Sequence, residues 1–199
     1  MAAETRVLLT RHGQSEWNAR GRWQGQADPP LSDLGRQQAH EAARSLGALD
    51  AIWASDLRRA AETAVIIGED IGVGPVVLDP DLRERDAGEW TGLTRVQIER
   101  RYPGSLPDGR RPPAWEPDDQ LLARARLALR RIADAAPDGD VLVVTHAGLV
   151  FAVERQLGLE HARLANVEGR WLTVARDGLR PGERMLLAAP EDVTVPNQM

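Results

Sequence analysis

The sequence predicts an α/β fold with three layers, α/β/α, in which helices cover both faces of a mainly parallel sheet with an antiparallel edge strand. Two observations predict this class. Short apolar runs alternate with longer segments whose apolar residues recur at helical spacing, an order typical of parallel sheets. Near the end of the chain, two apolar runs flank the turn signal RDGLRPGE, which indicates a hairpin at one edge.

Four apolar runs rich in β-branched residues or leucine are expected to be buried strands, because they lack the polar alternation of a sheet with one solvated face. They are residues 6–10, 51–54, 76–78 and 141–145. The edge hairpin is expected to comprise residues 170–178 and 183–189.

Helices are expected between these strands. Ser32 can cap a helix that runs through about Leu46, with Gly47 beyond its end. Asp56 can cap a second helix, whose apolar positions share one face. A long, arginine-rich amphipathic helix is expected over residues 118–136.

The length of 199 residues suits a single domain. We expect this domain to span residues 1–190 and residues 191–199 to form a frayed tail. Residues 102–119 are rich in proline, glycine and charge, with too little apolar content for a packed element, so a lid-like loop is expected. Within it, Arg110 and Arg111 could reach an acidic ligand, but a solvated loop is the favoured interpretation.

The composition disfavours several kinds of partner. The net charge of -5 leaves no electrostatic footprint for nucleic acid. The N-terminal MAAETRVLL has an acidic residue where a signal peptide would be basic, and its apolar run is too short for a membrane span. We therefore expect a cytoplasmic protein with no nucleic-acid or membrane partner, and a homodimer stays open.

The chain contains neither cysteine nor lysine. Disulfides, thiolate catalysis and cysteine metal sites are therefore excluded, and Schiff-base chemistry and Walker-type phosphate loops lose their amine. All 25 residues of the Lys+Arg total are arginines. Most of them are interpreted as solvated surface, but the arginine fork suits bidentate binding of phosphate or carboxylate.

Two predicted strands end in a histidine. VLLTRHGQSEWN places Arg11 and His12 after the first strand, and VLVVTHAG places His146 after another. Because ligands bind at the carboxyl ends of strands in open parallel sheets, the two imidazoles face one crevice if these strands are neighbours. Gly13 and Gly148 follow the histidines and are expected to expose backbone N–H groups there. A lone histidine is usually structural, but this matched pair beside an arginine favours an anion-binding site.

Other strand ends add charge to the same edge. Arg58 and Arg59 fall in the first turn of the helix after the second strand, where the helix dipole favours an anion. The third strand leads to Glu84, a candidate proton donor or acceptor among these cations. A surface salt bridge of Glu84 with Arg83 or Arg85 is the equally weighted alternative.

Four motifs in order run over nearly the whole chain: TRHGQSEWN with QGQADPPLSDLGRQQA, then SDLRRAAETA, then LRERDAGEWTGL, then VVTHAGL. Together they resemble the histidine phosphatase superfamily, also called phosphoglycerate mutase-like. The resemblance implies a phosphoglycerate mutase-like fold and a phosphoryl-transfer enzyme that acts on a small phosphorylated metabolite.

The resemblance also implies a role for each matched residue. His12 is the nucleophile of a phosphohistidine intermediate, and Glu84 is the general acid/base that protonates the leaving alcohol and then activates water. Arg11 and Arg59 hold the phosphate oxygens, with Arg58 in the variable position of the motif, and His146 stabilises the transferring group. The other residues expected to line the phosphate or substrate side are Gly13, Asn18, Gln24 and Gly25.

Phosphoryl transfer also sets the expected charge states. Catalysis is mainly positioning plus preorganised positive charge, which two arginines and a protonated His146 would supply. For His12 to attack, one nitrogen must be neutral, and the other is expected to donate to a backbone carbonyl. Because arginines take the place of a cation, no metal and no cofactor is expected.

Three alternatives stand beside this interpretation. A metallohydrolase using His12 and His146 lacks the HxH, HExxH or acidic cluster that it needs. A 2,3-bisphosphoglycerate-dependent phosphoglycerate mutase is disfavoured because the segment after Glu84 is short and resembles the phosphatase version. A non-catalytic phosphate-ligand binding module of the same fold is disfavoured because all the chemical positions are filled.

We therefore expect a phosphatase for small phosphomonoesters of the sugar phosphate or phosphoglycerate type. WEPDDQ stands where such phosphatases usually carry Gly-Glu-Ser, and this leaves the particular metabolite open. Trp17 and Trp90 are expected to orient the loops of the first and third motifs. His40 and His161 have no partners in the pattern and are expected to be non-catalytic.

Overall fold

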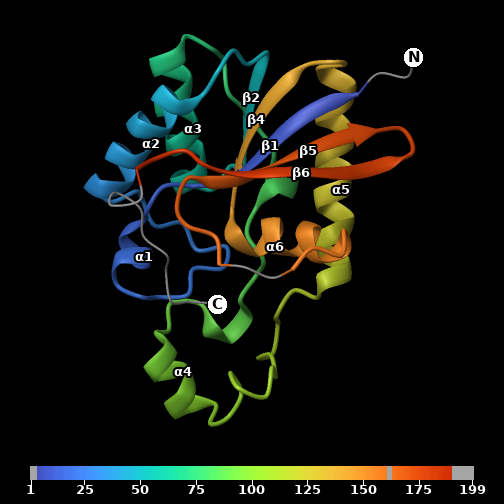
Figure 1. The fold of residues 1–199 in the computed structure, drawn as a ribbon. Coiled ribbons are helices and arrows are strands. Elements are labelled where there is room, and N and C mark those ends of the chain that lie inside the picture. The colour runs from blue at the N-terminus through green and yellow to red at the C-terminus, as the bar shows by residue number, and fades with distance from the viewer. Residues whose placement is uncertain (1–3, 161–162, 190–199) are drawn as a thin grey trace.

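The computed structural model describes residues 4–160 and 163–189, so the expected tail at 191–199 lies outside the described residues. A six-stranded sheet forms the middle layer (Figure 1). The strands are β1 Thr5–Arg11, β2 Ala51–Ala54, β3 Val77–Leu78, β4 Asp140–Thr145, β5 Glu168–Ala175 and β6 Gly178–Leu186. Their order is β3-β2-β4-β1-β5-β6. The first four in this order pair in parallel and the last two form an antiparallel hairpin on β1, as the sequence predicts.

Helices cover both faces of the sheet. They are α1 Glu16–Ala19, α2 Asp33–Ser45, α3 Arg58–Ile71, α4 Arg95–Arg101, α5 Asp118–Ala135 and α6 Ala147–Gln156, and short 3₁₀ turns lie at Pro80–Leu82 and Gly88–Trp90. Figure 1 shows α2 and α3 on one side of the sheet and α5 and α6 on the other, with α4 apart from both layers. In the part of the chain that is described, no helix is long and apolar enough to cross a membrane.

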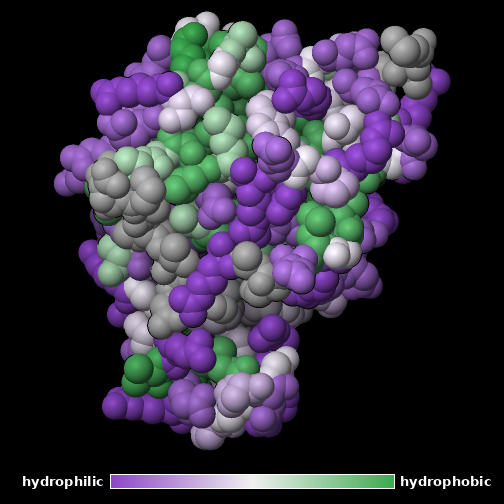
Figure 2. Space-filling model, in the orientation of Figure 1, coloured by the Kyte–Doolittle hydropathy of each residue, from purple (hydrophilic) through white to green (hydrophobic). Residues whose placement is uncertain are grey.

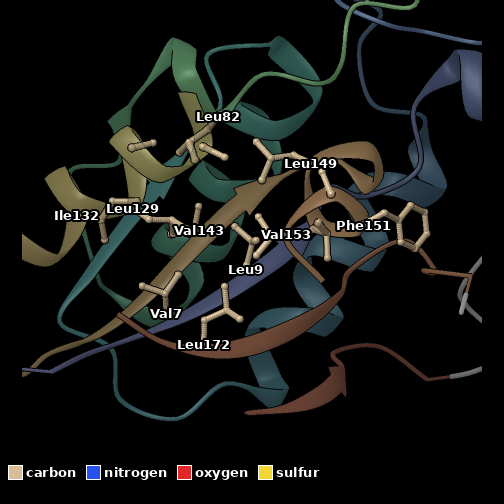
Figure 3. Packing of buried hydrophobic residues seen from close by; sticks show 14 of the residues in the cluster. Val7, Leu9, Leu82, Leu129, Ile132, Val143, Leu149, Phe151, Val153 and Leu172 are labelled. Atoms are coloured by element: carbon tan, nitrogen blue, oxygen red, sulfur yellow. The ribbon is translucent and has the colours of Figure 1, made fainter. Parts of the chain in front are cut away.

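Alternate residues of the central strands belong to two separate hydrophobic cores, one on each face of the sheet. Leu9 and Val143 point towards α5 and α6, and Figure 3 shows them among Leu129, Val153 and Leu172. Leu8 and Leu142, their neighbours in sequence, pack instead against α2 and α3. Because successive side chains of a strand face opposite ways, a strand covered on both faces must be apolar throughout. This is the physical origin of the continuous apolar runs in the sequence.

Most of the expected boundaries agree with the structure within a few residues. The hydroxyl of Ser32 accepts a hydrogen bond from the N–H of Gly35, so the predicted cap of α2 is confirmed. The predicted cap of α3 by Asp56 is wrong, because Leu57 occupies that position without a side-chain cap. The Asp56 carboxylate instead pairs with Arg83 at 2.5 Å.

Two features of the sheet also differ from expectation. β3 is not a buried strand: Val77 and Leu78 are 39% and 51% exposed, because β3 pairs only with β2 at the sheet edge. Figure 2 shows hydrophilic residues over much of the visible face, with hydrophobic ones gathered near the upper end of α3. The hairpin turn is shorter than RDGLRPGE suggests, since β6 already begins at Gly178.

Residues 102–119 pack more than their composition predicts. Trp90 is fully buried in a small core of its own, and partly buried Tyr102, Leu106 and Trp115 pack against that core. The rings of Trp90 and Trp115 meet edge to face with centroids 5.7 Å apart, a favourable arrangement for aromatic pairs. A few large aromatic side chains thus replace the many aliphatic ones that an ordinary packed element needs.

Candidate active site

Adjacent strands bring the two predicted histidines together. β1 and β4 pair in parallel with Arg11 level with Thr145, so His12 and His146 leave the sheet side by side. Their ring centroids are 5.1 Å apart, and both side chains are buried. The crevice expected from the two strand ends is therefore present.

His12 is held as a neutral imidazole with one defined tautomer. Its Nδ1 lies 2.6 Å from the carbonyl oxygen of Gly13, which can only accept, so Nδ1 carries the proton. Its Nε2 accepts a hydrogen bond from Nε of Arg59 at 3.2 Å. Burial, followed by the positive charges of Arg59 and Arg11, lowers the pKa of His12 well below its usual 6.5. The tautomer agrees with the expectation from the sequence.

The two arginines approach the imidazoles from different elements. Arg11 ends β1 and donates through Nη1 to the carbonyl of Leu164 at 2.7 Å, while its buried Nε has no partner among the described residues. Arg59, in the first turn of α3, donates to the carbonyls of Ala27 and Gly25. Burial lowers the pKa of each arginine to about 10, so both stay charged at neutral pH.

Arg58 and Arg59 are adjacent in sequence but differ in position. Arg59 is completely buried beside His12, whereas Arg58 is exposed and its backbone N–H donates to Asp28. The structure thus places the arginine assigned from the family spacing, and not its neighbour, against the histidine.

His146 differs from expectation in its charge. Burial, followed by the charge of Arg59, lowers the pKa of His146 well below 6.5, so the imidazole is neutral in the ligand-free protein rather than protonated. Neither ring nitrogen has a hydrogen-bond partner among the described residues. Together with Nε of Arg11, these buried polar atoms are available to a ligand that enters the crevice.

Glu84 reaches the same place from the 3₁₀ turn after β3. Its Oε1 accepts from the backbone N–H of Arg85 at 2.7 Å and its Oε2 from the N–H of Gly148 at 3.1 Å. The alternative of a surface salt bridge is wrong, since Arg83 pairs with Asp56 and Arg85 with Asp118. The Glu84 charge instead partly offsets the cost of burying Arg11 and Arg59.

The expectation that Gly13 and Gly148 expose backbone N–H groups in the crevice is wrong, because both N–H groups donate to side chains of the protein. The N–H of Gly148 lies in the first turn of α6 and is taken by Glu84. The N–H of Gly13 donates to the hydroxyl of Thr63 at 3.1 Å. A Cβ atom on Gly13 would lie 2.5 Å from the carbonyl oxygen of Gly35, so glycine is required here for close approach of two backbones.

A cavity of about 480 Å³ opens over these groups. Of the predicted site residues, its lining includes Arg11, His12, Gln24, Gly25 and Glu84. The other four, Gly13, Asn18, Arg59 and His146, are not among the lining residues. Asn18 is buried in a capping box with Ser15 at the start of α1, where it supports the loop that carries Gln24.

The outer part of the cavity contains residues that the sequence did not single out. They are Trp23, Arg85, Arg95, Trp115, Asp118, Arg155 and Arg163. Arg111 is exposed, as the interpretation of a solvated loop expects, but it also lines the cavity and lies over the Trp115 ring at 4.9 Å. Arg110 pairs with Asp108 and is exposed. The sequence shows only an Arg-Arg pair in a polar loop, and it does not show that the Trp115 and Trp90 rings lie under Arg111.

The WEPDDQ segment stabilises the loop that carries Glu84. Glu116 pairs with Arg124 of α5 at 2.7 Å, and Arg124 donates to the backbone carbonyls of Arg83 and Glu84. The segment therefore holds the loop with Glu84 in place without a Gly-Glu-Ser sequence, and its residues Trp115 and Asp118 line the cavity.

Behind His12, a loop that the sequence did not flag supports the site. Asn166 donates through Nδ2 to the backbone carbonyl of His12 at 2.9 Å. Glu168 accepts from the N–H of Ala165 and pairs with Arg184, and Arg184 also pairs with the buried Glu154. This ion cluster anchors the β5–β6 hairpin against α6, next to the loop that contacts Arg11 and His12.

The remaining interpretations concern residues away from the cavity. His40 is exposed and pairs with Asp70, in line with a non-catalytic role, and His161 lies outside the described residues. Within the ranges 4–160 and 163–189, no group of three or more His, Cys, Asp or Glu side chains could hold a metal ion.

Comparison with known proteins agrees with this geometry. Residues 7–177 match the family model of the histidine phosphatase superfamily, branch 1. A glucosyl-3-phosphoglycerate phosphatase of Mycobacterium tuberculosis is 35% identical over 83% of this chain and 86% of its own length. A metal-independent phosphoserine phosphatase of Arabidopsis thaliana is 36% identical over 75% of this chain and 67% of its own length.

The fold has a solved counterpart. A mycobacterial glucosyl-3-phosphoglycerate phosphatase, determined with VO3, superimposes with a TM-score of 0.80 at 34% identity over 89% of this chain and 97% of that one. The fold is therefore phosphoglycerate mutase-like. The chain belongs to the histidine phosphatase superfamily, branch 1.

Proposed function

We propose that the protein is a metal-independent phosphatase that hydrolyses small phosphomonoesters through a phosphohistidine on His12. The observation that supports this proposal is the state of His12: the proton sits on Nδ1, facing the Gly13 carbonyl, and the lone pair of Nε2 accepts a hydrogen bond from Nε of Arg59. A neutral nitrogen that carries a lone pair is what attack on phosphorus requires. In the ligand-free protein, Arg59 donates its hydrogen bond to this lone pair. When a phosphate binds, Arg59 donates to the phosphate instead and the lone pair becomes available.

Arg11, Arg59 and His146 bind the oxygens of the transferring group. Phosphoryl transfer spreads charge over the equatorial oxygens, and buried cations stabilise it strongly because they need no reorganisation. A phosphate dianion beside His146 favours its charged form, so we expect His146 to take up a proton on binding and to become a further cation. Gln24 and Gly25 border the cavity and complete the phosphate side. Asn18 supports Gln24 through Ser15, and Gly13 packs against Gly35 beside His12.

Glu84 is the general acid and base of the reaction. Of the two carboxylates lining the cavity, Asp118 is paired with two arginines, which leaves Glu84 as the acid/base. In the first step the N–P bond forms at Nε2, the ester P–O bond breaks and Glu84 gives its proton to the leaving oxygen. In the second step Glu84 takes a proton from water, which attacks phosphorus and breaks the N–P bond.

The substrate is a sugar phosphate or a phosphoglycerate-type ester. The names of the mycobacterial and plant relatives support this class, and a cavity of about 480 Å³ suits a small metabolite. Residues 102–119 act as the lid of this cavity, because Leu106, Arg111 and Trp115 line it.

A phosphate-release screen over phosphorylated metabolites, run with excess chelator, tests the proposal. We expect turnover that persists in chelator and is lost in His12→Ala, together with an acid-labile, base-stable phosphoryl group trapped on the wild-type protein. Full activity in His12→Ala would overturn the mechanism. Isomerisation of 3-phosphoglycerate that depends on 2,3-bisphosphoglycerate, without phosphate release, would identify a mutase, and binding without any turnover would identify a binding module.

A further inference from the structure

The outer part of the cavity is strongly basic, in contrast to the chain as a whole. Beyond the groups assigned to the phosphate, five more arginines line it: Arg85, Arg95, Arg111, Arg155 and Arg163. The only lining carboxylate on that side, among the described residues, is Asp118, although the chain carries a net charge of -5. Positive residues gathered in one cleft concentrate the field there and favour anionic ligands.

Asp118 neutralises part of this charge. Its two carboxylate oxygens pair separately with Arg85 and Arg155, each at 2.6 Å. Asp118 is the first residue of α5 and belongs to the WEPDDQ segment. An internal carboxylate therefore occupies a two-arginine site at the mouth of the cavity.

Arg111 has no such partner. It lies over the rings of Trp115 at 4.9 Å and Trp90 at 5.9 Å, and no salt bridge or hydrogen bond of its guanidinium is present within the described ranges. Burial, followed by the positive charge of Arg85, lowers the pKa of Arg111, and the charge of Asp118 offsets this only in part. A guanidinium stacked on aromatic faces keeps its planar N–H edge for a carboxylate or phosphate.

We propose that the outer cavity is a subsite for a second anionic group of the substrate, which Arg111 binds and for which Asp118 competes at Arg85 and Arg155. This inference rests on the proposed function and narrows it: preferred substrates are phosphomonoesters that carry a carboxylate or a second phosphate away from the scissile ester. The rigid aromatic support under Arg111 lowers the entropic cost of binding the distal anion.

A matched substrate pair tests this subsite. 3-Phosphoglycerate and glycerol 3-phosphate share a skeleton and differ by a carboxylate in place of a hydroxymethyl group. We expect wild-type kcat/KM to favour 3-phosphoglycerate, and Arg111→Gln to reduce this ratio about 10- to 100-fold, the range for one charged hydrogen-bonded contact. Arg110→Gln, the adjacent arginine paired with Asp108, is the matched control and should leave the ratio unchanged.

A second pair, fructose 1,6-bisphosphate against fructose 6-phosphate, distinguishes the source of the anion. A preference in the first pair alone assigns the subsite to a carboxylate, and a preference in the second alone assigns it to a phosphate. Equal kcat/KM within both pairs, or a ratio unaffected by Arg111→Gln, would overturn the inference.

The Asp118→Asn variant should show a stronger preference for doubly anionic substrates than the wild-type protein. Removing the internal carboxylate frees Arg85 and Arg155, so the preference for the doubly anionic substrate should increase. A decrease would mean that Asp118 holds these arginines in their binding positions and would contradict its role as a competitor.

Calorimetry on the His12→Ala protein separates this inference from the proposed function. If no ester is hydrolysed by the wild-type protein, the proposed function fails. Tighter binding of 3-phosphoglycerate than of glycerol 3-phosphate, lost in His12→Ala/Arg111→Gln, would still support the subsite, and equal binding would overturn it. Conversely, if hydrolysis depends on His12 but kcat/KM does not depend on the carboxylate of the substrate, the proposed function is supported and the subsite is refuted.

Discussion

The Nε atom of Arg59 donates a hydrogen bond to Nε2 of His12 over 3.2 Å, linking the first turn of α3 to the end of β1. This contact has two consequences. It keeps Nε2 unprotonated, because an N–H donor requires a lone pair opposite it. It also places a buried cation against the nitrogen that we propose as the nucleophile.

Replacing Arg59 should therefore affect the chemical step. We expect Arg59→Gln to lower kcat about 100- to 1,000-fold, the usual loss for one preorganised donor to a transition-state oxygen. Arg58→Gln changes the neighbouring but exposed arginine and should retain near wild-type kcat. Steady-state kinetics with p-nitrophenyl phosphate would measure both, and equal losses in the two variants would contradict the assignment.

The role of Glu84 predicts a dependence on the leaving group. Glu84→Gln cannot donate a proton, so hydrolysis of an alkyl phosphate should slow by about 100- to 10,000-fold. p-Nitrophenolate leaves without help, so its release should slow far less. Comparison of kcat for glycerol 3-phosphate and p-nitrophenyl phosphate checks this, and a uniform loss across both esters would rule against Glu84 as the general acid.

Buried neutral histidines predict a loss of stability in acid. The pKa values of His12 and His146 are lowered in the folded state, whereas in the unfolded chain they return to about 6.5. Below that pH the unfolded state binds more protons, so the free energy of unfolding must decrease as pH falls, by up to about 1.4 kcal/mol per pH unit for each histidine.

Urea unfolding at pH 7.5, 6.5 and 5.5 in phosphate-free buffer measures this slope. His146→Gln removes one of the two groups and should show a shallower decrease over the same interval. An identical slope in the variant would mean that His146 is already protonated in the folded protein. Because the pKa of His12 is lowered, we also expect His12 to stay unprotonated and able to act as the nucleophile below pH 6.5.

The close approach of Gly13 to Gly35 predicts a steric effect on the site. A Cβ at position 13 would lie 2.5 Å from a backbone oxygen that cannot rotate away. We expect Gly13→Ala to destabilise the protein by about 1–3 kcal/mol, as for other overpacked sites, and to displace His12. Gly47→Ala, where no atom lies within 4 Å of the added Cβ, is the control. Thermal unfolding of both variants tests this, and equal melting temperatures would refute the clash.

The pattern of the sequence was enough to predict the strands and the helices α2, α3 and α5, whereas α1, α4 and α6 were not predicted. The apolar runs of β1 and β4 and the Ser32 cap were confirmed because they depend on local periodicity and on one short hydrogen bond. β3 was predicted as buried and is exposed, since two residues cannot reveal which strand stands at an edge. The prediction that Asp56 caps α3 was wrong because its carboxylate pairs with Arg83, which is distant in the sequence.

The sequence by itself determined the chemical inventory: histidines and an arginine at strand ends, a glutamate nearby, and no lysine or cysteine. Only the tertiary structure decided how these groups behave. The neutral state of His146, the difference between Arg58 and Arg59, and the position of Arg111 over Trp90 all depend on burial and on residues far apart in the chain. Desolvation and Coulomb energy are set by the surroundings in space, and a local pattern of residues does not contain them.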